Sequence, residues 1–260
     1  MITSSQNPKI KWVRVLLGRP KERREANAFV VEGVRLVEEA EARDWSFRFA
    51  LYDNSLNERG RSIVERLRFR GVDVEEISES LMKSLSDTET PQGILAILEL
   101  NQLPMMNSSN FILIPDQVRD PGNLGTLLRS AAATGVQAVL FPSETTDAFA
   151  PKVVRAGMGA HFRLPIRSMS WEEINVQIKD LQIYLADMDG QSCWQTDLRQ
   201  PLALIIGGEA EGASEAAQKL AARRISIPMS GNVESLNAGV AGSVLMFEVV
   251  RQRSNDDISL

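Results

Sequence analysis

A short polar loop near the end of the chain holds the densest group of residues that could bind a ligand. It lies in the stretch Ile225 to Glu248, where a β-type segment leads through the loop into an apolar helix. Several polar groups beside buried apolar structure are typical of a ligand pocket. As a plain connection, the loop would need only a helix cap, which Ser235 or Asn237 alone supplies. The polar loop residues are Ser230, Gly231, Asn232, Glu234, Ser235 and Asn237.

A second group of candidates follows an apolar segment typical of a buried strand. Gly207, Gly208 and Gly212 surround Glu209. Glycine lets a backbone approach a ligand closely and adopts positive φ, so this loop is a candidate binding loop. The spacing is not that of the Gly-x-Gly-x-x-Gly dinucleotide motif, and the loop comes late in the chain. A simple left-handed turn is the structural alternative.

A third group lies on a predicted helix that begins near Pro121. Asn123, Gly125 and Arg129 follow one another at short intervals there, among buried leucines. A guanidinium group can orient a phosphate or stabilise a developing negative charge. A structural ion pair between Arg129 and a neighbouring carboxylate is the alternative.

These three segments, in this order, resemble the three motifs of the SpoU/TrmH family, the RNA 2′-O-ribose methyltransferases of the SPOUT superfamily. Asp120 to Val136 resembles the first motif, Leu204 to Gly212 the second, and Ile227 to Asn237 the third. Each motif alone is moderately specific, whereas three in order are highly specific. The chain departs from the usual pattern after Asn237, where it has Ala-Gly-Val-Ala and many members have Val-Ser-Val-Ala.

The resemblance implies an α/β protein with two domains. The C-terminal one would be a SPOUT methyltransferase domain with a deep trefoil knot, and the smaller N-terminal one an L30e-like α/β domain that binds structured RNA. It also implies a homodimer formed through the knotted domain. Periodicity by itself favours a plain doubly wound sheet, with its ligand at the carboxyl ends of the strands. The knot therefore comes from the resemblance alone.

The resemblance also implies the cofactor, S-adenosylmethionine, and the residues that serve it. For Ile227 and Leu236 taken alone, a place in the core is the alternative. The expected cofactor-binding residues are Gly207, Gly208, Gly212, Ile227, Pro228, Met229 and Leu236. The expected catalytic set is Asn123, Arg129, Glu209, Ser235 and Asn237.

Methylation of a ribose 2′-OH needs a methyl donor, loss of the hydroxyl proton and in-line placement of the reactants, but no metal. The resemblance makes Arg129 the catalytic residue, which in the family is often proposed to accept the 2′-OH proton. Because a guanidinium pKa lies above about 12, orienting a phosphate or stabilising the alkoxide is physically easier. Asn123 is expected to position Arg129 or the ribose, and Glu209 to pair with Arg129 or order the loops. Ser235 and Asn237 are expected to bind substrate, hold the loop or cap a helix.

The expected substrate is ribosomal RNA, 23S in particular, with tRNA as the alternative. A non-catalytic RNA-binding or ribosome-assembly module on the same fold is the competing function. A nucleotide-binding oxidoreductase is the third, and the missing Gly-x-Gly-x-x-Gly motif argues against it.

The composition and charge of the chain limit the classes of protein to which it can belong. The chain has 260 residues, of which 43% are hydrophobic and 24% charged, as in soluble globular proteins. No apolar run approaches the ~20 residues of a membrane span. One cysteine, Cys193, and one histidine, His161, cannot build a usual zinc site, and they fit a reducing, cytoplasmic location. The net charge is −5, yet residues 1–24 carry seven basic residues against Glu22, which predicts a local basic surface for RNA.

The expected organisation is a domain at 1–100, a polar linker at 101–110 and a second domain at 111–260. Strands alternate with helices in both domains. Expected strands are Ala28–Val31, Phe47–Leu51, Val72–Val74, Ile94–Leu100, Phe111–Pro115, Ala138–Phe141, Gln182–Ala186, Leu202–Ile206 and Arg224–Ile227. Expected helices are Asn7–Leu17, Val34–Ala40, Ile63–Leu67, Asn123–Thr134, Pro151–Met158, Trp171–Asp180, Ser214–Ala222 and Asn237–Gln252.

Overall fold

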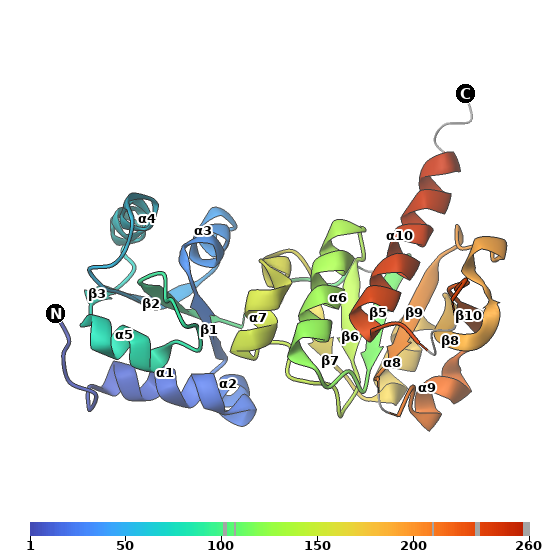
Figure 1. Cartoon of the computed structure of the whole chain (residues 1–260), viewed down its shortest axis with the longest axis horizontal. Helices are drawn as coiled ribbons and strands as arrows, with labels where there is room; N and C mark the ends of the chain where they lie inside the picture. Colours follow the sequence, from blue (N-terminus) through green and yellow to red (C-terminus); the bar gives the residue numbers. More distant parts are fainter. Residues whose placement is uncertain (101–102, 107, 210, 232–234, 257–260) are drawn as a thin grey trace. The chain divides into compact units, whose positions relative to one another are not determined.

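The computed structural model describes residues 1–100, 103–106, 108–209, 211–231 and 235–256 (Figure 1). Residues 101, 102 and 107 of the predicted linker and residues 257–260 lie outside this range. The chain divides into two compact units. The first comprises residues 1–101 and 149–162, and the second comprises 102–148 and 163–260. This grouping differs from the sequence prediction, which assigned 149–162 to the second domain.

The first unit is built on a four-stranded sheet in the order β1-β4-β2-β3. The β1–β4 and β4–β2 pairs are antiparallel, and β2–β3 is parallel, so the sheet is mixed. β3 begins two residues later than the sequence predicted, at the last residue of the expected strand. The strands are β1 (Ala28–Glu32), β2 (Phe47–Tyr52), β3 (Val74–Glu76) and β4 (Ile94–Glu99).

Five helices of the first unit precede β4, and two of them, α2 and α5, were not predicted. α1 begins where sequence rules place it, because the Asn7 side chain accepts from the Lys9 N–H at 2.9 Å and Pro8 occupies the first turn. The helices are α1 (Pro8–Gly18), α2 (Pro20–Glu25), α3 (Val34–Ala42), α4 (Glu58–Phe69) and α5 (Glu79–Leu85).

The basic surface predicted at residues 1–24 is partly wrong. Arg23 is only 3% exposed, and its guanidinium donates to the Leu16 and Leu17 carbonyls. Lys9 is paired with Asp73 and Glu75. Two of the seven charges therefore hold the unit together: Arg23 by bonding backbone carbonyls at the end of α1, and Lys9 by pairing with carboxylates more than sixty residues away.

Aromatic contacts explain why the segment 149–162 groups with the first unit. This segment contains α7 (Pro151–Gly157) and a 3-10 turn, η1 (Ala160–Phe162). The Phe149 ring lies 5.1 Å from the Phe29 ring, and the Phe162 ring lies 5.1 Å from the Trp45 ring, both edge-on. Such pairs stabilise packing beyond simple area burial.

The second unit contains a six-stranded sheet in the order β10-β8-β9-β5-β6-β7, in which every pair is parallel. β5, β6 and β9 are apolar along nearly their whole length, as strands covered on both faces must be. The short β7 was not predicted. The strands are β5 (Phe111–Asp116), β6 (Ala138–Phe141), β7 (Ile166–Ser168), β8 (Gln182–Ser192), β9 (Leu202–Gly207) and β10 (Arg223–Ser226).

Helices α6 and α10 of the second unit pack against each other. Ser130 and Ser243 share a hydrogen bond of 2.7 Å between their hydroxyl oxygens, and Gly242 lies against Leu127. Gly239 and Gly242 thus permit a close approach of the two helices. The helices are α6 (Pro121–Ala133), α8 (Trp171–Ile178), α9 (Glu215–Leu220), α10 (Ala238–Asp256) and the 3-10 turn η2 (Cys193–Gln195).

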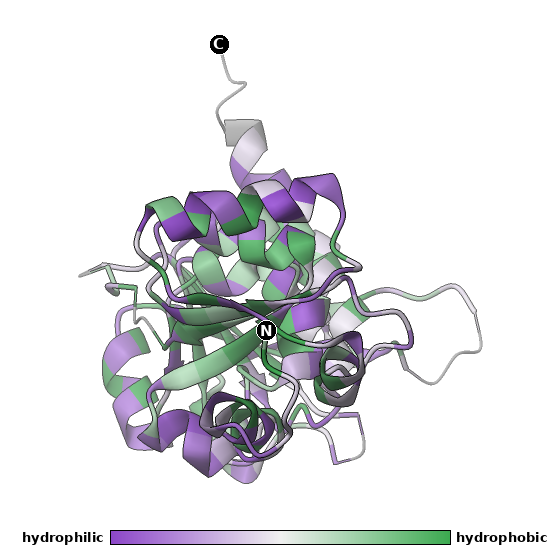
Figure 2. Cartoon of the chain, turned by 90° about the vertical axis from the view of Figure 1, so that its left-hand side faces the viewer, coloured by the Kyte–Doolittle hydropathy of each residue, from purple (hydrophilic) through white to green (hydrophobic). Residues whose placement is uncertain are grey.

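The hydropathy of the residues agrees with this arrangement of sheets and helices. Figure 2 shows strands mostly in green and helices with one purple and one green face. The hydrophobic core on one face of the six-stranded sheet includes Ile112, Leu140, Leu185 and Ile205, each at most 1% exposed. Across the described ranges, no helix combines the length and hydropathy of a membrane span.

We expect Gly242→Val to lower the free energy of unfolding by about 1–3 kcal/mol, because the added side chain overlaps the buried Leu127. Urea denaturation measures the change. Gly18→Val in α1 is the control, since a Cβ there meets no atom within 4 Å. Equal effects of the two substitutions would contradict the close packing of α6 on α10.

Candidate functional site

The candidate site lies at the carboxyl ends of β5 and β9. These two strands are parallel neighbours, and their last residues, Asp116 and Gly207, are paired in register. The chain leaves β5 toward α6 and leaves β9 into the glycine-containing loop. The carboxyl ends of adjacent parallel strands are where α/β sheets bind ligands.

Two helices begin at this site, and each has a side-chain cap. The Asp120 carboxylate accepts from the Asn123 N–H at 2.8 Å at the start of α6. The Asn237 side chain accepts from the Val240 N–H at 3.2 Å at the start of α10. The predicted capping role of Asn237 is therefore confirmed. These caps satisfy backbone donors that a helix N-terminus leaves unpaired.

The side chain of Asn123 joins the three motif segments. Its amide nitrogen donates to the Glu209 carboxylate, and its amide oxygen accepts from the Asn237 amide at 2.7 Å. The partners lie 86 and 114 residues away in sequence. Sequence reasoning offered Glu209 as a partner of Arg129. In the structure Glu209 instead bonds Asn123, because Asn123 lies on the first turn of α6, at the same end of the sheet as Glu209.

Arg129 lies six residues further along α6, about 9 Å from Asn123 along the helix axis. It is exposed, and within the described ranges no hydrogen bond or ion pair engages its guanidinium group. Neither predicted partner, Asn123 or Glu209, holds it. Arg129 is therefore available to bind an anion from outside the chain.

In the glycine loop, backbone segments pack closely against one another. Gly208 and Gly212 form an antiparallel bridge, in which each backbone N–H donates to the other residue's carbonyl. The nitrogen-to-oxygen distances are 3.1 and 3.2 Å. A Cβ on Gly207 would lie 2.7 Å from the Ala213 nitrogen, and one on Gly208 would overlap the Gln117 carbonyl. Gly212 has φ +69°, where glycine is favoured. Glycine is thus required at these positions by the loop itself.

The apolar residues predicted to enclose a cofactor are incompletely covered. Met229 and Leu236 are 38% and 37% exposed, and Ile227 and Pro228 are half-buried. This differs from the alternative that placed Leu236 in the core. Ser235 is exposed. Asn232 and Glu234, two other polar residues of this loop, lie outside the described residues.

One residue of the site was missed by sequence reasoning. Asp116 is 1% exposed, and its carboxylate accepts from the Ser214 N–H at 2.6 Å, which fixes the end of the glycine loop. Its other oxygen, Oδ1, is buried without a hydrogen-bond partner among the described residues. Burial raises the pKa of Asp116, against the lowering effect of the Ser214 hydrogen bonds. An acidic residue directly after the apolar run FILIP was the available signal.

The described residues contain no group of three or more His, Cys, Asp or Glu side chains arranged to hold a metal ion. His161 is 2% exposed, and its ring lies edge-on to the Phe149 ring with 5.4 Å between the ring centroids. This burial beside an aromatic ring fits a structural role.

Comparison with known proteins identifies relatives across the whole chain. Residues 110–247 match the family model described as SpoU rRNA Methylase family, and residues 7–96 match the MRM3-like substrate binding domain. The 23S rRNA (guanosine(2553)-2′-O)-methyltransferase of Bacillus subtilis is 32% identical over 95% of this chain and 98% of its own length. The 23S rRNA (uridine(2479)-2′-O)-methyltransferase of Streptomyces viridochromogenes is 31% identical over 96% and 92%.

A solved structure gives the same result. The AdoMet-bound rRNA methyltransferase from Sinorhizobium meliloti superposes with a TM-score of 0.85 at 29% identity. The match covers 96% of this chain and 97% of that one. The similarity therefore extends over both units.

We expect the free energy of unfolding of the Asp116→Asn variant to increase relative to that of the wild type as pH rises. Asparagine keeps an acceptor for Ser214 but does not ionise. A raised carboxyl pKa means that the folded wild type binds more protons than the unfolded chain, so its stability falls as pH rises through that pKa. Urea denaturation from about pH 4 to about pH 7 measures the difference.

Asp197→Asn is the control of opposite sign. Hydrogen bonds from Arg199 lower the pKa of Asp197 to about 2, so its contribution is lost only as pH falls below the unfolded value of about 3.9. Its stability difference is therefore expected to be flat from about pH 5 upward. A flat profile for Asp116→Asn as well would contradict a raised pKa at Asp116.

Proposed function

This chain belongs to the SpoU rRNA methylase family, and we propose that it transfers a methyl group from S-adenosylmethionine to a ribose 2′-OH of ribosomal RNA, 23S rRNA in particular. The family predicted from the three motifs is confirmed. The observation that carries the proposal is the meeting of those motifs at Asn123, which bonds Glu209 and Asn237. The names of the relatives support the substrate and the position of the methyl group.

The cofactor site follows from the glycine loop and the exposed apolar residues beside it. Bare backbone at Gly207 and Gly208 would bind the adenosine part, with Gly212 holding the loop. The apolar side chains of Ile227, Pro228, Met229 and Leu236 would enclose it. Their incomplete burial fits a ligand whose adenine ring covers them. When bound, the sulfonium of S-adenosylmethionine supplies an electrophilic methyl carbon.

Arg129 is the residue proposed to act on the RNA. A guanidinium group donates hydrogen bonds and has no acceptor, so Arg129 is proposed to serve as a clamp rather than a base. A planar fork can hold a phosphate next to the reacting ribose and stabilise negative charge on the 2′ oxygen as the hydroxyl proton leaves. Asn123, Glu209, Ser235 and Asn237 would hold the surrounding loops and contact the ribose. Holding the hydroxyl in line can supply up to about 7–11 kcal/mol of the barrier.

A homodimer formed through α10 is part of the proposal. Val240, Val244 and Phe247 are 47%, 37% and 52% exposed, and their spacing puts them on one face of the helix. Large apolar side chains in a row at the surface typically mark an interface. A second copy of the chain would cover this face and bring a partner surface close to α6.

Three finer expectations belong to the same proposal. They are the trefoil knot of the second domain, the L30e-like fold of the first, and the cytoplasmic location. The knot is supported by the return of the last helix, α10, onto α6, the first helix of the second unit. The mixed four-stranded sheet covered by helices supports an L30e-like first domain.

We expect the wild type to transfer tritiated methyl groups to unmodified 23S rRNA, and Arg129→Ala to lose at least about 100-fold in rate. Arg129→Lys should also lose most activity, because a point charge lacks the planar fork. Cofactor binding, measured by calorimetry, should persist in both variants. Lys179→Ala, at the exposed C-cap position of α8, is the control and should remain active.

Nuclease mapping of the labelled RNA locates the methyl group. Label on a base rather than a ribose would contradict the proposed reaction. Cofactor and RNA binding without any transfer to rRNA or tRNA would favour the competing function, a non-catalytic RNA-binding module.

We expect Phe247→Glu to convert a dimer to a monomer, because it places a charge in the apolar face of α10. Light scattering after gel filtration measures the mass. Val176→Glu is the control, since Val176 is 65% exposed on α8 and lies outside that face. If both variants keep the wild-type mass, α10 is not the interface.

A further inference from the structure

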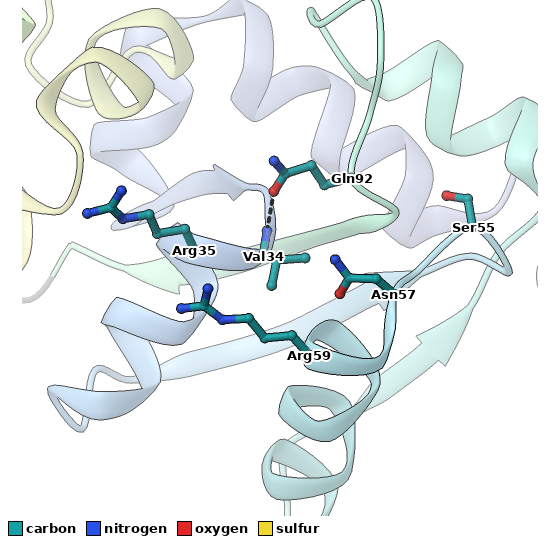
Figure 3. Close-up of a pocket in the computed structure, with 6 residues that line it drawn as sticks. All are labelled: Val34, Arg35, Ser55, Asn57, Arg59 and Gln92. Atoms are coloured by element: carbon teal, nitrogen blue, oxygen red, sulfur yellow. Dashed lines mark hydrogen bonds between the residues drawn. The ribbon is translucent and has the colours of Figure 1, made fainter.

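Two adjoining cavities lie on the first unit, between α3 and α4. Their volumes are about 250 and about 390 Å³, and Arg35 and Arg59 line both of them. Both cavities are lined by residues of the first unit, whereas the three motifs of the proposed methyl-transfer site belong to the second. The remaining lining residues of the first cavity are Val34, Ser55, Asn57 and Gln92 (Figure 3).

The N-termini of two helices meet at the first cavity. Val34 is the first residue of α3, and Asn57 is the N-cap of α4. The N-cap residue of α3 is Gly33, which has no side chain to cap the helix. Each helix N-terminus carries an effective charge of about +0.5. The two N-termini therefore add positive potential to the cavity.

The two amide side chains of the cavity are oriented to donate. The Gln92 oxygen accepts from the Val34 N–H at 2.9 Å, and the Asn57 oxygen accepts from the Gly60 N–H at 2.9 Å. Because a backbone N–H can only donate, each amide oxygen must face it. The two NH₂ groups remain, and among the described residues neither has an acceptor. Ser55 is already used, since its hydroxyl donates to Asp53 at 2.6 Å.

The arginines add charge on one side of the cavity. Figure 3 shows Arg35 from α3 and Arg59 from α4 extending in the same direction. Arg35 is exposed, and no hydrogen bond or ion pair to it occurs in the described part of the chain. Arg59 is held by Glu38, with 2.9 Å from Nε to the carboxylate. One guanidinium is thus free, and the other is fixed next to it.

The acidic groups lie beside the first cavity rather than on its wall. Glu38 and Glu39 line the second cavity, and the buried Asp53 carboxylate is turned to Ser55. The Arg59 hydrogen bond lowers the pKa of Glu38, so this carboxylate is charged and balances Arg59. The first cavity therefore presents one uncompensated cation, two amide donors and two helix N-termini.

We infer that this cavity binds a backbone phosphate of the RNA substrate, with Arg35 as the main ligand. The inference rests on the proposed function, because a unit that holds structured RNA must contact phosphates away from the reacting ribose. A guanidinium fork matches two phosphate oxygens, and the Asn57 and Gln92 amides can donate to the phosphate or to a neighbouring 2′-OH. The site would fix the position of the first unit along the RNA without reading its sequence.

The test compares Arg35→Gln with Arg43→Gln in the full chain. Both arginines are exposed residues at opposite ends of α3, and neither has a partner among the described residues, so each substitution removes the same charge. The affinity for an unmodified 23S rRNA transcript is measured at several salt concentrations. We expect Arg35→Gln to bind about tenfold more weakly. The logarithm of its RNA association constant should also fall less steeply with the logarithm of the salt concentration. The slope should be smaller in magnitude by about 0.7–0.9, which corresponds to the counterions released by one phosphate contact.

Glu38→Gln gives a change in the opposite direction. Loss of this carboxylate frees Arg59 for the phosphate, so RNA binding should tighten and its salt slope should steepen. Arg43→Gln should keep the wild-type slope. Calorimetry with S-adenosylmethionine should give wild-type affinity for all three variants, since none lies in the second unit.

The outcomes separate this inference from the proposed function. If the wild type methylates rRNA but Arg35→Gln and Arg43→Gln have the same affinity and slope, the phosphate site is wrong and the methyltransferase proposal stands. If the wild type binds RNA and Arg35→Gln alone loses affinity and slope, the site is supported even where no methyl transfer occurs. A wild type that binds no RNA overturns both.

Discussion

The bridge made by the Asn123 amide is the interaction on which the candidate site depends. An amide has both a donor and an acceptor, and this one uses each toward a different segment, donating to Glu209 and accepting from Asn237. A carboxylate at this position would repel Glu209, and a hydroxyl could not reach both partners at once. The bridge links the start of α6, the loop after β9 and the start of α10. These three segments carry the three family motifs, so their shared geometry is set at a single side chain.

Small residues and caps make this bridge possible. Gly239 and Gly242 allow α10 to lie close to α6, and the Ser130–Ser243 hydrogen bond fixes the two helices in register. Asp116 holds the far end of the glycine loop through the Ser214 N–H. The polar groups of the site are therefore largely occupied with one another, and this preorganisation leaves Arg129 and the apolar rim of the loop for ligands.

The two units use charge in different ways. The chain is acidic overall, and some of its basic residues, such as Arg23 and Lys9, stabilise the fold. The cations proposed to bind RNA are Arg129 in the second unit and Arg35 in the first. The side chain of each lacks a partner in the described part of the chain. On this proposal net charge is a poor guide to nucleic-acid binding, because a phosphate is recognised by local groups within a screening length of a few ångströms to about 10 Å.

The sequence by itself determined the family, the near-continuous apolar strands β5, β6 and β9, and the cap at Asn237. These depend on short motifs and on the local period of apolar residues, which neighbouring positions in the chain define. The tertiary structure alone decided that Glu209 bonds Asn123, that Arg23 is buried, that residues 149–162 pack in the first unit, and that Asp116 closes the glycine loop. Three of these rest on contacts between residues 86 or more positions apart, and the burial of Arg23 rests on the packing of α2 against the end of α1. Such contacts depend on which strands and helices become neighbours, and no local pattern specifies that.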